Sequence, residues 1–225
     1  MYIRLSLFLI TLQLTCPAMS GTVYFGGDYS VKVLSIAEQR FKTIYKQKYD
    51  FSCGSATLAS LLSFHYDDEV SELSVFKDMY EHGDKDKITH QGFSLLDMKQ
   101  YLTRRGYKSN GFKINLEQLA RAKTPAITII NNNGYLHFVI IKGTNGKDVL
   151  VGDPAVGLKS IKSKDFMELW GSRILFIIQD KQQIAANHFN NPEDWDHQVK
   201  APLGLAIDHS SLGLFNVLQP SSIDF

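Results

Sequence analysis

The first half of the chain carries apolar residues at the three- to four-residue spacing that is typical of helices. Small and apolar residues fill every face of residues 52–62, which predicts a buried helix capped by Asp50 or Ser52. Over residues 69–81 apolar side chains recur at helical intervals, and Gly83 predicts the end of that second helix.

A polar segment follows the second predicted helix. Residues 84–91 are mainly charged or polar, and we expect a loop there. Ser94 and Asp97 have the spacing of a capping box, which predicts a helix over residues 95–105 that a left-handed Gly106 closes. Two shorter elements are expected next, an extended piece over residues 107–112 and a brief helix over residues 116–122.

The second half changes to the pattern of β-strands. Runs of β-branched and apolar residues are separated by Asn-Asn-Asn-Gly, Thr-Asn-Gly-Lys and Asp-Pro, which are turn sequences. These runs predict strands over residues 126–130, 136–142, 148–151 and 173–179. Ser163 predicts the cap of a helix that reaches Trp170. A helical first half followed by an antiparallel sheet indicates an α+β domain.

The N-terminus has the features of a secretory signal peptide. Arg4 supplies a positive charge, residues 5–14 are apolar, and small residues around Ala18 and Ser20 suit signal peptidase. Lipid attachment through Cys16 is disfavoured, because Gln13 stands where such a site usually has leucine. We therefore expect a periplasmic protein, and no later stretch approaches the roughly 18 apolar residues that a transmembrane helix needs.

The predicted domain organisation follows from these boundaries. It comprises a signal peptide over residues 1–20, an N-terminal arm over residues 21–36, a single domain over residues 37–180, and a C-terminal tail or accessory segment over residues 181–225. The length of 225 residues and the 44% hydrophobic content suit one substantial core.

The charge balance excludes some partners. Lys and Arg number 24 against 23 Asp and Glu, so the net charge of +1 provides no broad field for nucleic acid and no basic run for a membrane surface.

The six histidines other than His137 occur in polar or loop-like sequence without metal-ligand spacing, namely His65, His82, His90, His188, His197 and His209. We therefore expect neither a metal nor a cofactor.

Cys53 is the first residue with candidate chemistry. Removal of residues 1–20 would leave it as the only thiol, so it could form no intrachain disulfide. Its position at a predicted helix N-terminus favours the thiolate and aims its backbone amide at a bound carbonyl oxygen. Gln47, six residues earlier, is the candidate for a second donor. The competing interpretation is a buried and inert cysteine.

His137 is the candidate base, because it alone among the histidines interrupts an apolar strand pattern. It could also be a core histidine with its hydrogen bonds satisfied. A three-residue hairpin loop over residues 144–146, with Gly146 left-handed, would place His137 opposite Asp153. A two-residue loop would shift the register by one and send Asp153 to the other face, unless the strand leaves the ladder at Gly152. Asp153 also precedes a proline, where a plain turn role is common.

Four sequence segments together resemble the papain-like peptidases that remove double-glycine leader peptides from bacteriocins and related exported substrates. They are Gln47 to Gly54, Gly92-Phe93-Ser94-Leu95-Leu96-Asp97, Leu136-His137-Phe138-Val139 and Gly152-Asp153-Pro154. The six-residue step from glutamine to cysteine and the sixteen-residue step from histidine to aspartate are similar to the family pattern. The resemblance covers roughly residues 37–180.

The resemblance implies a papain-like fold with Cys53 as nucleophile, His137 as base, Asp153 orienting it, and Gln47 in the oxyanion hole. It also implies a polypeptide substrate cut after Gly-Gly. Standalone exported members of this kind accompany secretion systems for functional amyloid, so an amyloid subunit or a secretion-system component is the expected partner. Two other functions remain open: a non-proteolytic binding or chaperone module for an exported polypeptide, and a cell-wall endopeptidase or amidase.

Overall fold

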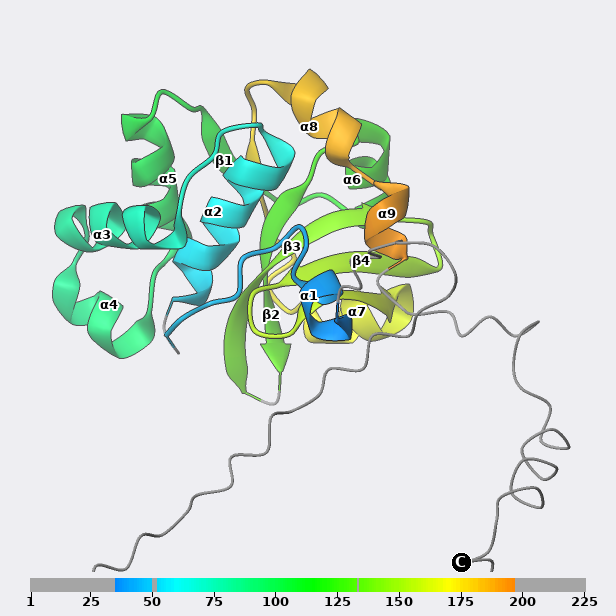
Figure 1. Cartoon of the computed structure of the whole chain (residues 1–225), viewed down its shortest axis with the longest axis horizontal. Coiled ribbons are helices and arrows are strands. Elements are labelled where there is room, and N and C mark those ends of the chain that lie inside the picture. The colour runs from blue at the N-terminus through cyan, green and yellow to red at the C-terminus, as the bar shows by residue number, and fades with distance from the viewer. Residues whose placement is uncertain (1–34, 50–51, 133, 197–225) are drawn as a thin grey trace, which may run out of the picture. The chain divides into compact units, whose positions relative to one another are not determined.

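The structure is a computed structural model that describes residues 35–49, 52–132 and 134–196 (Figure 1). The predicted signal peptide, most of the predicted arm, and residues 197–225 lie outside the described residues, as do Cys16, Asp50, His197 and His209. None of the described helices is long and apolar enough to cross a membrane.

The described residues form helices around one antiparallel sheet, whose strand order differs from the order along the chain (Figure 1). The helices are α1 (Ile36–Arg40), α2 (Cys53–His65), α3 (Glu72–His82), α4 (Lys85–Gln91), α5 (Leu95–Arg104), α6 (Leu116–Ala122), α7 (Ser163–Leu169), α8 (Gln182–His188) and α9 (Pro192–Trp195). The strands are β1 (Ser109–Phe112), β2 (Ala126–Asn132), β3 (Tyr135–Thr144), β4 (Asp148–Asp153), β5 (Gly157–Lys162) and β6 (Leu175–Ile178). The sheet order is β1-β6-β2-β3-β4-β5 with every pair antiparallel, which confirms the predicted α+β class.

Strand alternation divides the core between the two faces of the sheet. Phe138 and Ile140 of β3 belong to the cluster that includes the apolar residues of α2, α3 and α5. Val139 and Ile141 belong to the opposite cluster, with Phe166 and other residues of α6 and α7. Successive side chains of a strand point to opposite faces, so β3 is covered on both sides. The almost uniformly apolar sequence of α2 reflects its burial at the centre of the first layer.

Several local predictions are confirmed. Ser94 and Asp97 form the expected capping box, with both reciprocal hydrogen bonds present at the start of α5. Gly106 follows that helix with a φ of 82°, the left-handed conformation expected of it. Helix α6 covers the predicted residues 116–122.

The prediction of a loop over residues 84–91 is wrong, because these residues form α4. The side chain of Asp84 caps this short helix by accepting a hydrogen bond from the amide of Lys87. Ile88 is fully buried and anchors the helix to the core. One cap and one buried side chain are therefore enough to fold a segment whose composition is otherwise that of a loop.

Two predicted caps are also wrong. Ser52 occupies the N-cap position of α2, but its hydroxyl donates to the carboxylate of Glu72 at 2.7 Å instead of accepting from a helix amide. Ser163 is the first residue of α7, and its hydroxyl donates to the carbonyl oxygen of Gly146. In both places a tertiary partner takes the hydroxyl. Strand β5 was not predicted, because its sequence Gly-Leu-Lys-Ser-Ile-Lys is short and largely polar.

The register between β3 and β4 differs from the three-residue hairpin. Thr144 pairs with Val149, so the loop is longer than expected, although Gly146 is left-handed as predicted. The register then shifts between Gly143, which pairs with Leu150, and Ile141, which pairs with Val151. Lys142 is thus the extra residue of a β-bulge.

The bulge decides which face Asp153 occupies. If the pairing of Gly143 with Leu150 continued unchanged, Asp153 would face Ile140 and point away from the face of His137. The shift pairs Ile140 with Gly152 instead. One step further along the ladder places Asp153 beside Val139, two residues from His137 and on the same face. The predicted proximity of His137 and Asp153 therefore arises from a different register than the one expected.

Residues 182–196, within the segment predicted as a tail or accessory segment, form α8 and α9. The amide of Asn190, between these helices, donates to the carbonyl oxygen of Lys142 at 2.9 Å. Gly143 has no room for a side chain, because a Cβ there would collide with Asn190. The α8–α9 segment therefore packs directly on the bulge.

We predict that replacing Gly157 by alanine destabilises the fold more than the same change at Gly146. Both glycines have positive φ, which costs alanine about 1–2 kcal/mol. A Cβ at Gly157, which pairs with Asp153, would also lie 2.7 Å from the carbonyl oxygen of Arg40, whereas the space around Gly146 is open. The free energy of unfolding in urea should fall by about 3 kcal/mol or more for G157A. Equal losses for the two variants would contradict this packing.

Candidate active site

Cys53 is the first residue of α2, where its backbone amide has no carbonyl partner within the helix. Its thiol is buried and is the free cysteine of the described chain. One turn further along, the hydroxyl of Thr57 donates to the carbonyl oxygen of Phe138 at 3.2 Å. This buried hydrogen bond fixes the start of α2 against the strand residue that follows His137.

His137 and Asp153 form a buried pair across β3 and β4. Nε2 of the imidazole lies 2.7 Å from Oδ1 of the carboxylate. The ring of Tyr135, two residues earlier on the same strand face, stacks on the imidazole at a centroid distance of 5.9 Å. The aspartate and the tyrosine therefore hold the ring from its edge and from its face.

Nδ1 of His137 is the nitrogen left for another group. It is buried and has no hydrogen-bond partner among the described residues. The Cys53 thiol is nevertheless one of the groups that act on the imidazole and raise its pKa. A buried ring nitrogen without a partner is costly in a purely structural role. The arrangement therefore suits an imidazole that exchanges a proton with the thiol.

The electrostatics of the pair favour its charged form. Burial by itself opposes the charged imidazole, but the hydrogen bond to Asp153, the charge of Asp153 and the Cys53 sulfur raise the pKa of His137 to about 9. Burial likewise opposes the Asp153 carboxylate, but hydrogen bonds and positive charge from His137 and Lys159 lower its pKa to about 2. At neutral pH an imidazolium thus faces a carboxylate.

Asp153 has two further partners, of which Lys159 was not predicted from the sequence. Its Oδ1 accepts from the amide of Ala155 at 2.9 Å, and its Oδ2 accepts from Nζ of Lys159 at 2.7 Å. The first contact is the turn role that was expected of an aspartate before proline, and it coexists with the histidine contact. Lys159 belongs to β5, and it could have been found only if this strand had been predicted to fold back on β4.

Gln47 lies in the segment between α1 and α2. Its backbone amide donates to the carbonyl oxygen of Pro154 at 2.9 Å, next to Asp153. Its side-chain Nε2 donates to the carbonyl oxygen of Tyr49 at 3.2 Å, which leaves one amide hydrogen for another acceptor. The predicted oxyanion residue is therefore held beside the Asp153-Pro154 turn, and in this structure its amide turns toward Tyr49.

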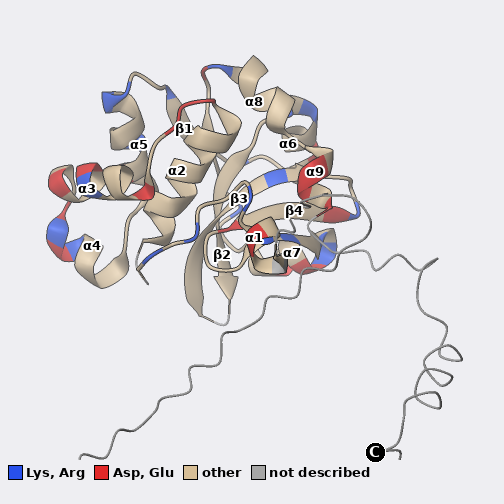
Figure 2. Cartoon of the chain, in the orientation of Figure 1, with Lys and Arg blue, Asp and Glu red and all other residues tan. Residues whose placement is uncertain are grey.

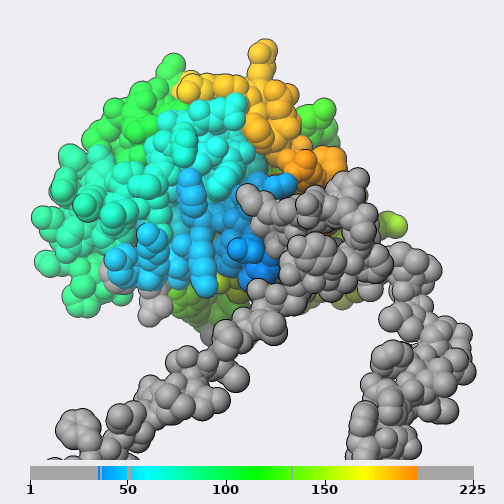
Figure 3. Space-filling model, viewed as in Figure 1, coloured from blue at the N-terminus to red at the C-terminus, as the bar shows by residue number. Residues whose placement is uncertain are grey.

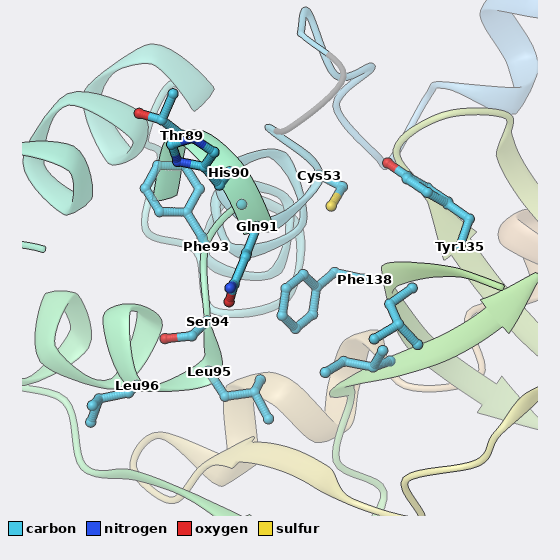
Figure 4. A pocket seen from close by; sticks show the side chains of 13 residues that line it. Cys53, Thr89, His90, Gln91, Phe93, Ser94, Leu95, Leu96, Tyr135 and Phe138 are labelled. Carbon is cyan, nitrogen blue, oxygen red and sulfur yellow. The ribbon is translucent and has the colours of Figure 1, made fainter. Parts of the chain in front are cut away.

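A cavity of about 840 Å³ opens beside Cys53 (Figure 4). Figure 4 shows the sulfur facing this cavity, with Tyr135 and Phe138 from β3 and Phe93 from the turn before α5 around it. Gln91 of α4 also points into it. The exposed Leu96 extends the apolar lining outward. Sequence analysis had selected the thiol without locating this cavity.

Of the other histidines of the described chain, His90 lines the same cavity as Cys53, and the prediction about His65 is wrong. His65 was assigned to polar surroundings, but it is the last residue of α2 and is fully buried. Burial keeps its pKa well below the usual value. No group of three or more histidine, cysteine or acidic side chains within residues 35–49, 52–132 and 134–196 could hold a metal ion.

Acidic and basic residues are interspersed on α3 and α4 (Figure 2).

A thiol at the start of a central helix, opposed by an imidazole and a carboxylate from an antiparallel sheet, defines a papain-like cysteine peptidase. The Peptidase C39 family model matches residues 41–182. The chain therefore belongs to the Peptidase C39 family, whose members are cysteine peptidases.

Two curated relatives extend the match beyond the family segment. A probable functional amyloid protease, FapD, of Pseudomonas aeruginosa is 40% identical over 162 residues, which are 72% of this chain and 70% of the relative. The FapD of Pseudomonas fluorescens is 37% identical over 180 residues, 80% of this chain and 77% of the relative. The solved peptidase domain of Streptococcus ComA, a bifunctional ABC transporter, shares the fold with a TM-score of 0.51 and 19% identity, over 60% of this chain and 96% of that domain.

We predict that replacing Asp153 by asparagine lowers the pKa of His137 by more than one unit, because burial would then dominate. In the unsubstituted chain, the raised pKa of His137 adds to the free energy of unfolding. This contribution is complete below pH 6.5 and is lost as the pH rises through about 9. An NMR titration of the imidazole measures the pKa directly. D148N, on the same strand, should leave it unchanged, and a value that stays near 9 in D153N would contradict the assigned cause.

Proposed function

We propose that this chain is an exported cysteine peptidase that cleaves a secreted, fibre-forming polypeptide after Gly-Gly, through an acyl-enzyme on Cys53. The observation that carries the proposal is that the His137 imidazole is bound to Asp153 and acted on by the thiol of Cys53, which lines one large apolar cavity. Each residue comes from a different element, so their meeting is a property of the fold and not of any single motif.

In the first half of the proposed reaction, the Cys53 thiolate attacks the carbonyl carbon of the scissile peptide bond. The oxyanion that forms accepts hydrogen bonds from the Cys53 amide and from Nε2 of Gln47. Gln47 needs only to turn its amide from Tyr49, because its backbone is already held by Pro154. The His137 imidazolium then protonates the leaving amine as the C–N bond breaks.

In the second half, water attacks the thioester carbonyl and His137 removes its proton. Collapse of the intermediate releases the carboxylic acid and returns the sulfur as a thiolate beside the imidazolium. Asp153 keeps Nε2 engaged throughout at 2.7 Å, so that Nδ1 is the nitrogen that exchanges protons. Lys159 and the Ala155 amide hold the carboxylate in place for this role.

The walls of the cavity support a preference for small residues before the cut. Phe93, Tyr135 and Phe138 line the cavity at the approach to Cys53, and the proposal assigns to these three rings the exclusion of a side chain beside the sulfur. A glycine pair would pass, and the apolar extension toward Leu96 would take larger residues further upstream. A second cavity of about 280 Å³ borders His137 and Val156, and we assign it to the residue after the cut.

The fibre-forming substrate and the location are proposed on separate grounds. The two Pseudomonas relatives carry the name of a functional amyloid protease, which supports an amyloid subunit or another secretion-system component as substrate. The signal-peptide features of residues 1–20 support export to the periplasm.

We predict that the purified chain cleaves a peptide containing Gly-Gly and that C53A abolishes this cleavage. Replacing the glycine before the cut by leucine should prevent cleavage, because the aromatic walls exclude its side chain. Mass spectrometry of the products locates the cut, and the same leucine placed three residues after the cut serves as the control. Full biological function of C53A in cells would contradict the proposal and favour a binding module. Digestion of peptidoglycan instead of the peptide would favour a cell-wall enzyme.

A further inference from the structure

The ammonium group of Lys142 is buried at the bulge in β3 and has a complete set of partners. It lies 2.7 Å from Oδ2 of Asp194 in α9, and it donates to the carbonyl oxygen and the hydroxyl of Thr43 at 2.9 and 2.6 Å. The side chains of Lys142 and Asp194 are only 1% and 4% exposed. Three acceptors match the three hydrogens of the ammonium, and the Thr43 hydroxyl in turn donates to Asp194 at 2.7 Å.

This cluster of Thr43, Lys142 and Asp194, here called the lysine hub, joins the α8–α9 segment to the two segments that lead to Gln47 and to His137. Lys142 is the extra residue that sets the register of His137 against Asp153. Its aliphatic stem covers Gly152, where an added Cβ would lie 3.2 Å from Cδ of the lysine. Thr43 precedes Gln47 by four residues in the segment that crosses to Pro154.

The third component of the hub comes from outside the segment that matches the family model. That match ends at residue 182, and Asp194 lies in the α8–α9 segment beyond it. Figure 3 shows this segment, in orange, lying against the blue residues that precede α2. Asn190 reinforces the attachment, because its side-chain amide donates to the carbonyl oxygen of Thr144 on the other side of the bulge.

Stability alone does not explain a buried ion pair. Burying both charges removes them from water, and apolar residues of similar volume are often as stabilising. A buried pair does, however, permit only arrangements in which all its hydrogen bonds are made. The bulge is the feature that such a restriction would protect, because a one-residue slip sends Asp153 to the other face of the sheet.

We propose that Lys142 and Asp194 are positioning residues: the lysine hub holds the β-bulge, and thereby the alignment of Asp153, His137 and Gln47 around Cys53. The inference rests on the proposed function, since it assigns a purpose to the alignment of those four residues. The hub itself touches neither the thiol nor a substrate, and it acts through the backbone of β3, β4 and the segment before α2.

The test compares two double variants of the full chain. K142M/D194L replaces the buried pair by apolar side chains, so that no lone charge is left inside. K42Q/E193Q removes the neighbouring ion pair, which joins the segment of Thr43 to α9 but has side chains 53% and 71% exposed. The readouts are the alkylation rate of Cys53 by iodoacetamide at pH 7, its pH profile and the melting temperature. None of them needs a peptide substrate.

We expect K142M/D194L to melt within about 5 °C of the parent. Its Cys53 should nevertheless be alkylated at least about tenfold more slowly at pH 7, with a profile displaced to higher pH, because a small misalignment of reacting groups has a large effect on rate. K42Q/E193Q should match the parent in all three readouts. T43V, which removes two hydrogen bonds but no charge, should show a smaller decrease in the same direction.

The inference would be overturned if Cys53 of a folded K142M/D194L variant were alkylated at the rate of the parent chain. It would also be overturned if the alkylation rate fell equally in K42Q/E193Q. If K142M/D194L does not fold, T43V decides, and parental alkylation by T43V overturns the inference. A parent that reacts no faster than free cysteine would overturn the proposed function, and the inference with it. A reactive parent with an unaffected folded double variant overturns the inference alone.

Discussion

The hydrogen bond between Nε2 of His137 and Oδ1 of Asp153 is the interaction on which the site depends. It joins two adjacent strands, leaves Nδ1 directed away from the carboxylate, and keeps a charged imidazole stable in a buried position. It exists only because both side chains lie on one face of the sheet. Since side chains alternate along a strand, any odd-numbered change in register would remove it.

Several polar contacts attach neighbouring elements to the His137–Asp153 pair. The Thr57 hydroxyl fixes α2, and hence Cys53, to the backbone next to His137. The Pro154 carbonyl fixes Gln47 beside Asp153. Lys159 occupies the second carboxylate oxygen, so Asp153 cannot turn from the imidazole without losing an ion pair. Each attachment is a single polar contact, and the Thr57 hydrogen bond is buried, where leaving either partner unpaired would be costly.

Much of the fold and the choice of site residues could be predicted from local patterns. A small-residue helix beginning at Cys53, a capping box at Ser94 and an apolar strand interrupted by His137 are all signals within about ten residues of sequence. Helix α4 escaped prediction because one aspartate cap and one buried isoleucine, Ile88, outweigh its polar composition.

The register could not be predicted in the same way. The bulge at Lys142 depends on contacts with Thr43 and with Asp194, and neither is a neighbour in sequence. Strand β5 and its Lys159 were missed for a related reason, since a short polar strand is recognisable only from the strand beside it. The side chains of the candidate site were thus selected from local sequence, but the backbone geometry that brings His137 and Asp153 together was not. Long-range polar contacts determine that geometry.

The central claim is that His137, Asp153 and Gln47 are arranged around the sulfur atom of Cys53. The most direct test is a crystal structure of the chain with a peptide aldehyde ending in Gly-Gly bound covalently to Cys53. The account predicts a tetrahedral adduct whose oxygen accepts from the Cys53 amide and from Nε2 of Gln47, with Nδ1 of His137 within hydrogen-bond reach of the reacting centre. An adduct with the imidazole remote from the sulfur, or with Gln47 still bonded to Tyr49, would contradict it.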